Sequence, residues 1–239
     1  MSLQGQTVVV MGGSSGIGLE TARIVAEVGA DTVITGRDSA KIADALSRLP
    51  PSVRGEAVDA SKVEALHEFF QRLGTFHHLV LSISSGGGAG PFATLDLVML
   101  RRAMEGKFFA QVQAAQAALK TIDREGSITF VTAASARTAL PGTVGLSAIN
   151  GALESIVKTL AFELKPLRVN AVSPGIVQTP IWDKWPEEQR RAMLEKEAKS
   201  LPVGRIGQPA DIAKAILLLL TNGFMTGTII ECDGGARLR

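Results

Sequence analysis

Three glycines with two serines between them are the residues whose types and spacing point most directly to ligand binding. Gly12, Gly16 and Gly18 follow a run of valines and precede a helical pattern of apolar residues. Glycine permits a tight turn and lets the backbone approach a ligand closely, and a helix start offers free N–H groups to phosphate. The stretch predicts a strand, a phosphate-binding loop and a helix. An ordinary tight turn is the alternative. The residues expected to contact a dinucleotide are Gly12, Ser14, Ser15, Gly16, Ile17 and Gly18.

Arg37 stands where the adenine ribose of such a dinucleotide is expected. It follows the predicted strand 31–35 and lies nineteen positions beyond Gly18. An acid at this place would accept hydrogen bonds from a free 2′-hydroxyl, whereas the guanidinium fork of an arginine binds a 2′-phosphate. Arg37 therefore favours NADP(H). The alternatives are a solvated arginine that opens the next helix and a plain ribose held by the neighbouring Asp38.

Strands and helices alternate along the rest of the chain, which predicts an α/β fold. Strands are expected at 8–10, 31–35, 53–58, 77–83, 127–132, 168–172 and 228–232, and later helices at 39–49, 61–73, 108–119, 143–153 and 209–220. Ser39 and Ser61 are the expected caps of two of these helices. We expect a Rossmann-type, doubly wound sheet of seven parallel strands with helices on both faces. His77 and His78 would lie at the amino end of their strand, away from a ligand, and are expected to be structural.

Composition bounds the remaining possibilities. The 239 residues are 46% hydrophobic and 20% charged, as expected of a single domain spanning 1–239. The net charge of +2 is spread without a basic patch, so no nucleic-acid partner is expected. Cys232 is the only cysteine, which excludes an internal disulfide and a cysteine metal cluster, and no metal site is expected. The sequence shows no signal peptide, and its longest aliphatic run, 216–220, is too short for a membrane, so a soluble cytoplasmic protein is expected.

The glycine spacing, together with Ser173-Pro174-Gly175-Ile176 and the segment through Pro180, resembles the short-chain dehydrogenase/reductase family over the whole chain. The resemblance implies that Asp59, with Ala60 beside it, lies at the adenine. It also implies that the nicotinamide is held by a loop. The loop residues expected at the nicotinamide are Pro174, Gly175, Ile176 and Thr179.

The same resemblance implies that 84–90 forms a loop over the cofactor and that about 178–202 forms a substrate lid. Trp182 and Trp185 open that lid. Two large rings favour a small substrate that is flat or apolar, and packing on a neighbouring subunit would explain them as well.

The family's catalytic side chains are expected to be missing. The family uses a serine, a tyrosine, a lysine four residues later and an asparagine on the preceding helix, but this sequence has no tyrosine. The first three positions fall on Ala133, Leu146 and Asn150, and the asparagine position falls on Lys107. Lysine and asparagine thus exchange places, which predicts Lys107 and Asn150 as a pair beside the nicotinamide ribose. The alternative is Lys107 as a solvated residue at a helix start.

Two windows, 108–119 and 143–153, contain no ionisable residue. Helices without charge are buried, either by the sheet or by a second subunit. In the family the corresponding helices pack on a second subunit, so the resemblance implies a homodimer or homotetramer.

Two functions remain. The first is an atypical NADP(H)-dependent reductase in which Lys107, a water or the substrate supplies the proton. The second is an NADP(H)-binding protein without redox turnover, acting as a sensor, a partner subunit or a scaffold for non-redox chemistry. The lid and the nicotinamide loop favour the first, and the sequence does not reveal the substrate.

Overall fold

The predicted alternation produces one parallel sheet flanked by helices. The structure is a computed structural model and describes residues 2–238. All seven strands are parallel, in the order β3-β2-β1-β4-β5-β6-β7. The strands are β1 (Thr7–Met11), β2 (Asp31–Gly36), β3 (Arg54–Ala57), β4 (Phe76–Leu81), β5 (Ile122–Val131), β6 (Arg168–Pro174) and β7 (Ile229–Cys232). This is the doubly wound arrangement that the sequence predicts.

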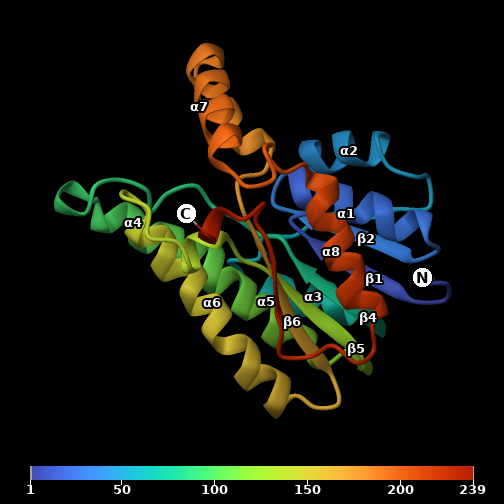
Figure 1. Cartoon of the computed structure of the whole chain (residues 1–239). Coiled ribbons are helices and arrows are strands. Elements are labelled where there is room, and N and C mark those ends of the chain that lie inside the picture. The colour runs from blue at the N-terminus through green and yellow to red at the C-terminus, as the bar shows by residue number, and fades with distance from the viewer. Residues whose placement is uncertain (1, 239) are drawn as a thin grey trace.

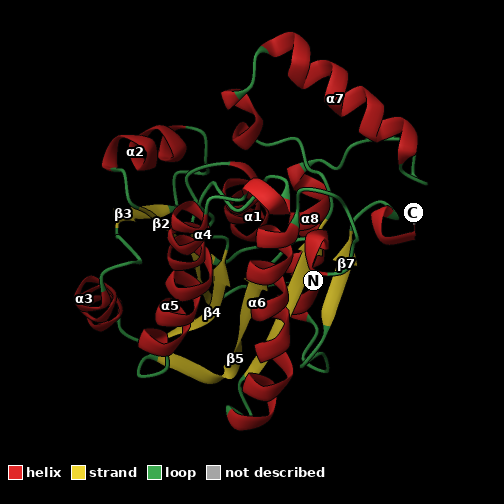
Figure 2. Ribbon diagram, turned by 90° about the vertical axis from the view of Figure 1, so that its left-hand side faces the viewer, coloured by secondary structure: helices red, strands yellow, loops and turns green. Residues whose placement is uncertain are grey.

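Helices cover both faces of the sheet (Figures 1 and 2). The helices are α1 (Gly16–Glu27), α2 (Ser39–Ser47), α3 (Val63–Leu73), α4 (Leu97–Met104), α5 (Ala110–Ala118), α6 (Val144–Glu163), α7 (Glu187–Ser200) and α8 (Pro209–Thr221). Helices α1, α2 and α8 share one apolar cluster, and α3, α5 and α6 share the other. A π-helical turn, Glu105–Phe109, joins α4 to α5.

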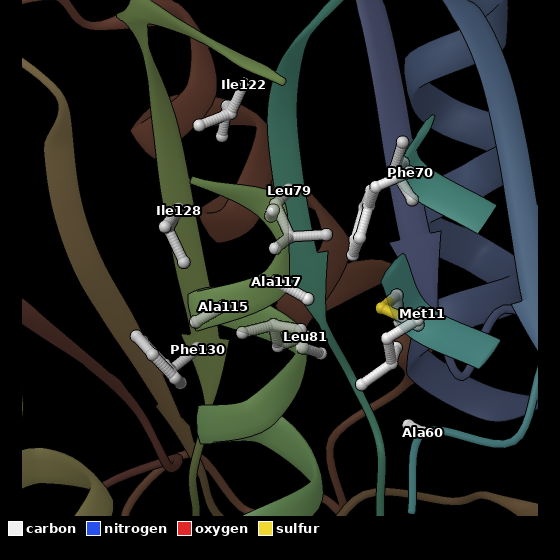
Figure 3. Close-up of a cluster of buried hydrophobic side chains, with 14 of the residues drawn as sticks. Met11, Ala60, Phe70, Leu79, Leu81, Ala115, Ala117, Ile122, Ile128 and Phe130 are labelled. Carbon is white, nitrogen blue, oxygen red and sulfur yellow. The ribbon is translucent and has the colours of Figure 1, made fainter. Parts of the chain in front are cut away.

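The central strands feed both clusters because their successive side chains point to opposite faces. In β1, Val9 and Met11 belong to the cluster under α3, α5 and α6, whereas Val8 and Val10 belong to the other. Figure 3 shows the first cluster, in which Met11, Leu79 and Phe130 come from three different strands. A strand buried on both faces needs a continuous apolar run, which is why these strands were recognisable in the sequence.

The element ends differ from the predictions at several points. The cap of α2 is Asp38 rather than Ser39, because Asp38 Oδ1 accepts hydrogen bonds from the N–H groups of Ala40 and Lys41. Ser61 does not cap α3, which begins at Val63; its N–H and hydroxyl donate to Asp59 instead. Strand β5 begins at Ile122, earlier than expected, and α6 continues to Glu163.

Helix α7 stands away from the body of the molecule (Figures 1 and 2). It lies within the predicted lid, follows the short turn Pro180–Lys184, and has no buried residue. No helix among residues 2–238 has the length and apolar character needed to cross a membrane.

His78 is the one histidine that lies buried within the described chain, at the amino end of β4. Its Nδ1 lies 2.8 Å from Ser127 Oγ and its Nε2 lies 2.9 Å from Gln6 Oε1. A neutral ring satisfies both contacts, with Nε2–H donating to the amide oxygen and Nδ1 accepting from the hydroxyl. Burial, with the nearby charges of Arg168 and His77, lowers the pKa of His78 to about 3. The histidine is structural, as the sequence predicts.

The buried His78 makes stability depend on pH. Its folded pKa lies below the unfolded value of 6.5, so the unfolded chain binds the extra proton between these values. The stability that the neutral His78 contributes to the folded state is fully present above about pH 6.5 and is lost as the pH falls toward 3. We expect the free energy of unfolding to drop by about 2 kcal/mol between pH 7 and pH 5, measured by urea denaturation. This drop should be absent in His78→Gln and present in His67→Gln, a control at an exposed residue. An equal drop in both variants would contradict the assignment.

Candidate active site at the carboxyl edge of the sheet

A cavity of about 410 Å³ opens where the strand order reverses between β1 and β4. Its walls come from the segments that follow β1 to β5 and from the loop after β6. Of the residues predicted to bind a cofactor, those that line it are Gly12, Ser14, Ser15, Gly16, Ile17, Arg37, Asp59, Ala60 and Thr179. Gly18, Pro174, Gly175 and Ile176 do not line it. The carboxyl edge at the reversal point is the usual ligand site of open α/β sheets.

The glycine loop is built by close backbone contacts. Gly12 has a φ of +83°, and a Cβ there would lie 2.6 Å from the carbonyl oxygen of Ser82. A Cβ on Gly18 would lie 2.2 Å from the carbonyl oxygen of Gly12. Gly16, with a φ of +53°, faces Thr179, whose Cγ2 would be 3.1 Å from a Cβ at that position. Side chains at these positions would push α1 away from β1 or close the loop, so the glycines keep the cradle open.

The cradle fits the phosphates of a dinucleotide. Helix α1 begins at Gly16, and the side chain of its N-cap residue Ser15 makes no capping hydrogen bond. The first N–H groups of a helix have no partner within the helix, and they line up with the positive end of its dipole. With the serine hydroxyls of Ser14 and Ser15 on the cavity wall, these groups are suited to a pyrophosphate.

Two cations stand at the end of the cavity beside β2. Arg37 and Lys41 both line it, both are exposed, and neither forms an ion pair with another described residue. Asp38 lines the cavity beside them, and its Oδ1 caps α2. Burial by itself would raise the pKa of Asp59. The hydrogen bonds that Asp59 accepts from Ser61, together with the charge of Arg37, outweigh this effect and lower its pKa below the usual value.

Lys107 enters the cavity from the π-helical turn. The ammonium is half-buried and donates a hydrogen bond of 3.3 Å to the carbonyl oxygen of Thr132. Burial lowers the pKa of Lys107 to about 8, and the negative charge of Glu154 acts in the opposite direction. The side chain is therefore not the solvated residue of the alternative interpretation. An extra residue in a helix turn re-aims side chains, and such turns are frequent at functional sites.

Asn150 is buried, but no hydrogen bond joins it to Lys107 within the described chain. Its Nδ2 donates to Ser135 Oγ at 3.0 Å and to the Leu146 carbonyl oxygen at 2.9 Å. Its Oδ1 is buried and has no partner among residues 2–238. Asn150 does not line the cavity that Lys107 enters, so the structure does not bring these two side chains together, and their pairing beside the ribose stays a prediction.

The residues at the family's serine and tyrosine positions carry no polar group. Ala133 and Leu146 are both partly exposed, and the loop Ser84–Gly90 packs over α6 beside them, since Gly88 lies against Gly145 and Leu146. That loop has no regular secondary structure, as predicted.

The loop after β6 and the start of the lid close the far side. Thr179, Pro180 and Ile181 line the cavity, whereas Gly175 packs on the last loop of the chain, where a Cβ would lie 2.6 Å from the carbonyl oxygen of Asp233. Trp182 Nε1 donates to the Val177 carbonyl oxygen at 2.8 Å, a contact between the short turn Pro180–Lys184 and the loop after β6. This hydrogen bond holds the start of the predicted lid against that loop.

Several functional residues were not found from the sequence. Lys41 lines the cavity because it lies in the first turn of α2, close to Arg37. Thr132 accepts a hydrogen bond from Lys107, and Glu154 accepts one from Thr132. Neither residue belongs to a sequence motif that would have placed it at the site. The one available sign was that Glu154 ends the charge-free window of its helix, four residues after Asn150 and on the same helix face.

Comparisons with known proteins agree with this geometry. Residues 12–237 match the family model described as enoyl-(acyl carrier protein) reductase. The short-chain dehydrogenase/reductase malC of Malbranchea aurantiaca is 29% identical, with 99% of this chain and 96% of that protein covered. The solved structure of MalC Reductase/Diels-Alderase from the same organism has a TM-score of 0.89 at 29% identity, covering 99% of this chain and 98% of that one. A small-chain dehydrogenase solved in complex with NADPH has a TM-score of 0.84 at 33% identity, covering 98% and 100%. The chain belongs to the short-chain dehydrogenase/reductase family.

Proposed function

We propose that this protein is an NADP(H)-dependent reductase that acts on a substrate already activated for hydride addition, without the phenol that the family uses as an acid. The observation that carries the proposal is the cavity itself. It joins a phosphate cradle, two free cations and the Lys107 ammonium along one continuous surface. A reductase of this family needs a nicotinamide cofactor, and this cavity offers groups for both ends of one.

The preference for NADP(H) over NAD(H) rests on charge. Arg37 and Lys41 are free to pair with a 2′-phosphate, and these two cations outnumber the carboxylate of the adjacent Asp38, whose Oδ1 caps α2. A guanidinium binds phosphate with two parallel hydrogen bonds. The NADPH complex of a related dehydrogenase supports the same choice.

Lys107 is the residue best suited to act near the reacting atoms. Bound NADPH supplies a hydride. The ammonium has three N–H donors, of which one is used by the Thr132 carbonyl, so two remain for a ribose hydroxyl, a water or the substrate. Its pKa of about 8 leaves it protonated at neutral pH while making it a better acid than an ordinary lysine.

The substrate class follows from what the site lacks. Ala133 cannot hold a carbonyl oxygen and Leu146 cannot give a proton, so a simple ketone would lack both groups with which the family acts on the carbonyl oxygen. An iminium carbon that gains a hydride becomes a neutral amine and needs no proton, and a polarised conjugated carbonyl needs less help than a ketone. The exposed Ile181 and Trp185 at the start of the lid favour a flat or apolar molecule.

A second candidate function is NADP(H) binding without redox turnover. The missing acid favours it, as does the similarity to MalC, whose name pairs a Diels–Alderase activity with the reductase activity. In that case the cavity would serve as a scaffold for a non-redox reaction, as a sensor or as part of a complex.

We also propose that two or four copies associate through α4, α6 and the π-helical turn. Figure 2 shows α4 and α6 on the same side of the molecule. Large apolar side chains are exposed on these two helices and on the π-helical turn between α4 and α5. They are Leu97, Val98, Met99, Phe109 and Val144, each 41% to 56% exposed. A cluster of this kind is typical of a protein interface.

The cofactor preference is tested with Arg37→Ala. Loss of a charge-assisted contact of roughly 1.5 to 3 kcal/mol should weaken NADPH binding by about one to two decades and leave NADH binding nearly unchanged, as measured by calorimetric titration. Arg54→Ala is the control, since Arg54 is an exposed arginine that pairs with Asp31 away from the cavity. Equal affinity of the unmodified protein for NADH and NADPH would refute the preference.

The role of Lys107 is tested with Lys107→Met. We expect NADPH binding at pH 7 to weaken about tenfold or more, since an ammonium donor to the ligand is lost. In the unmodified protein the affinity should fall as the pH rises through about 8, where Lys107 loses its proton, and this dependence should vanish in the variant. Lys120→Met, at an exposed lysine after α5, is the control. An identical pH dependence in Lys107→Met would remove Lys107 from the site.

The missing acid is tested by following NADPH absorbance with simple ketones and with activated acceptors such as iminium ions. A positioned general acid contributes roughly 10² to 10⁴ in rate. Ketone reduction by this protein should therefore be slower by about that factor than in an enzyme that has the family's tyrosine. The triple change Ala133→Ser, Leu146→Tyr and Asn150→Lys should raise ketone reduction, and Ala133→Ser alone should not. Fast reduction of simple ketones by the unmodified protein would disprove this account. NADPH binding with no turnover of any acceptor would favour the second candidate.

A further inference from the structure

Glu154 is a buried carboxylate on α6, in contact with a residue of the cavity wall. Its side chain is 8% exposed, and it is the first charged residue of α6. Oε1 accepts a hydrogen bond of 3.0 Å from the hydroxyl of Thr132, and Oε2 accepts one of 2.8 Å from Arg137 Nε. A buried charge costs several kcal/mol unless it is paired and hydrogen-bonded. Arg137 and Thr132 supply these partners, and Thr132 also leads from the carboxylate to the cavity.

Thr132 connects this carboxylate to Lys107. It directly follows β5, and its N–H donates to the Val172 carbonyl oxygen at 2.9 Å. Its hydroxyl contacts Glu154, and its carbonyl oxygen accepts from the Lys107 ammonium. The Glu154 carboxylate and the Lys107 ammonium thus contact two different groups of Thr132, whose backbone is bonded to the sheet. Through Thr132, a change in the position of Glu154 or Lys107 would alter the contacts of the other.

The charges around this residue alternate in sign from the cavity to the end of the chain. The charge of Glu154 acts on the pKa of Lys107, Glu154 pairs with Arg137, and Arg137 also pairs with Glu231. Arg237 continues the series with Glu231 and Asp233. Among the described residues, Glu154 is the charged group that acts on Lys107 from the elements packed against it, and Arg137 is the charged group that pairs with Glu154.

We propose that Glu154 is a positioning residue that keeps the Lys107 ammonium charged and fixed at the cavity wall. The proposal rests on the proposed function, in which Lys107 is the cation of the site. Arg137 does not cancel the effect, because its side chain is 36% exposed and shares its charge with Glu231, so solvent screens it more than it screens Glu154. Burial lowers the pKa of Lys107, and the charge of the nearby Glu154 carboxylate acts in the opposite direction.

The test measures the proton on Lys107 directly, without cofactor or substrate. Trace acylation with acetic anhydride over a range of pH, read by mass spectrometry, gives the apparent pKa of each lysine, and the exposed Lys120 serves as internal reference. Glu154→Gln should lower the apparent pKa of Lys107 by about one pH unit and leave that of Lys120 unchanged. Glu231→Gln is the matched control, since it removes the other carboxylate that pairs with Arg137 and should leave Lys107 unchanged.

A second variant has the opposite sign and guards against a folding defect in the first. Arg137→Gln leaves Glu154 without its competing cation and should raise the apparent pKa of Lys107. An unchanged pKa of Lys107 in Glu154→Gln, or in Arg137→Gln if the former does not fold, would overturn the proposal. Calorimetric titration with NADPH should then show a loss of about twofold at pH 7 and of about tenfold at pH 9 in Glu154→Gln, because Lys107 would give up its proton about one pH unit earlier. If NADPH does not bind the unmodified protein, the proposed function fails, while the acylation result still decides the role of Glu154.

Discussion

The contact between the start of α1 and the end of β1 is the constraint on which the site depends. The two backbones approach so closely that a Cβ on Gly18 would lie 2.2 Å from the carbonyl oxygen of Gly12. This contact keeps the N-terminus of the helix at the carboxyl edge of the central strand, beside the reversal of strand order. The unpaired N–H groups of the helix then open onto the cavity rather than onto solvent. The other walls are arranged around this fixed point.

The electrostatics around Lys107 follow from a second constraint, the burial of its side chain. With Ala133 and Leu146 at the positions where the family has a serine and a tyrosine, the described cavity holds one ammonium on its inner wall, that of Lys107. An opposite charge nearby favours the charged form of a buried group. We propose Glu154 for that role, and its own burial is balanced by Arg137 and Thr132. The chemistry that we propose here is that of an amine acid rather than that of a phenol.

The lid is built on a different principle from the core. Helix α7 has no buried residue and carries charge on all sides, so its position depends on its two ends. One end is fixed by the Trp182 contact with Val177, and the other returns to the body at the buried Leu201. The apolar core therefore does not hold this helix along its length.

Much of the fold was predictable because it is encoded locally. The apolar runs of β1 and β4, the glycine loop and the regular alternation of strands and helices depend on neighbours in the sequence, and the structure has the predicted doubly wound sheet. The ends of elements were less predictable. Asp38, not Ser39, caps α2, because both side chains are able to cap and only the path of the chain selects one.

The sequence by itself determined the dinucleotide cradle, the absence of any phenol and the presence of a lysine in place of the family's asparagine, because these depend on which residues occur and in what order. Only the tertiary structure decided what Lys107 contacts. Its carbonyl partner Thr132 is 25 residues away, and Glu154 approaches Thr132 across 22 residues. Hydrogen bonds between distant segments leave no periodic signal in the chain, because they form only when the fold brings the end of β5, the π-helical turn and the middle of α6 together.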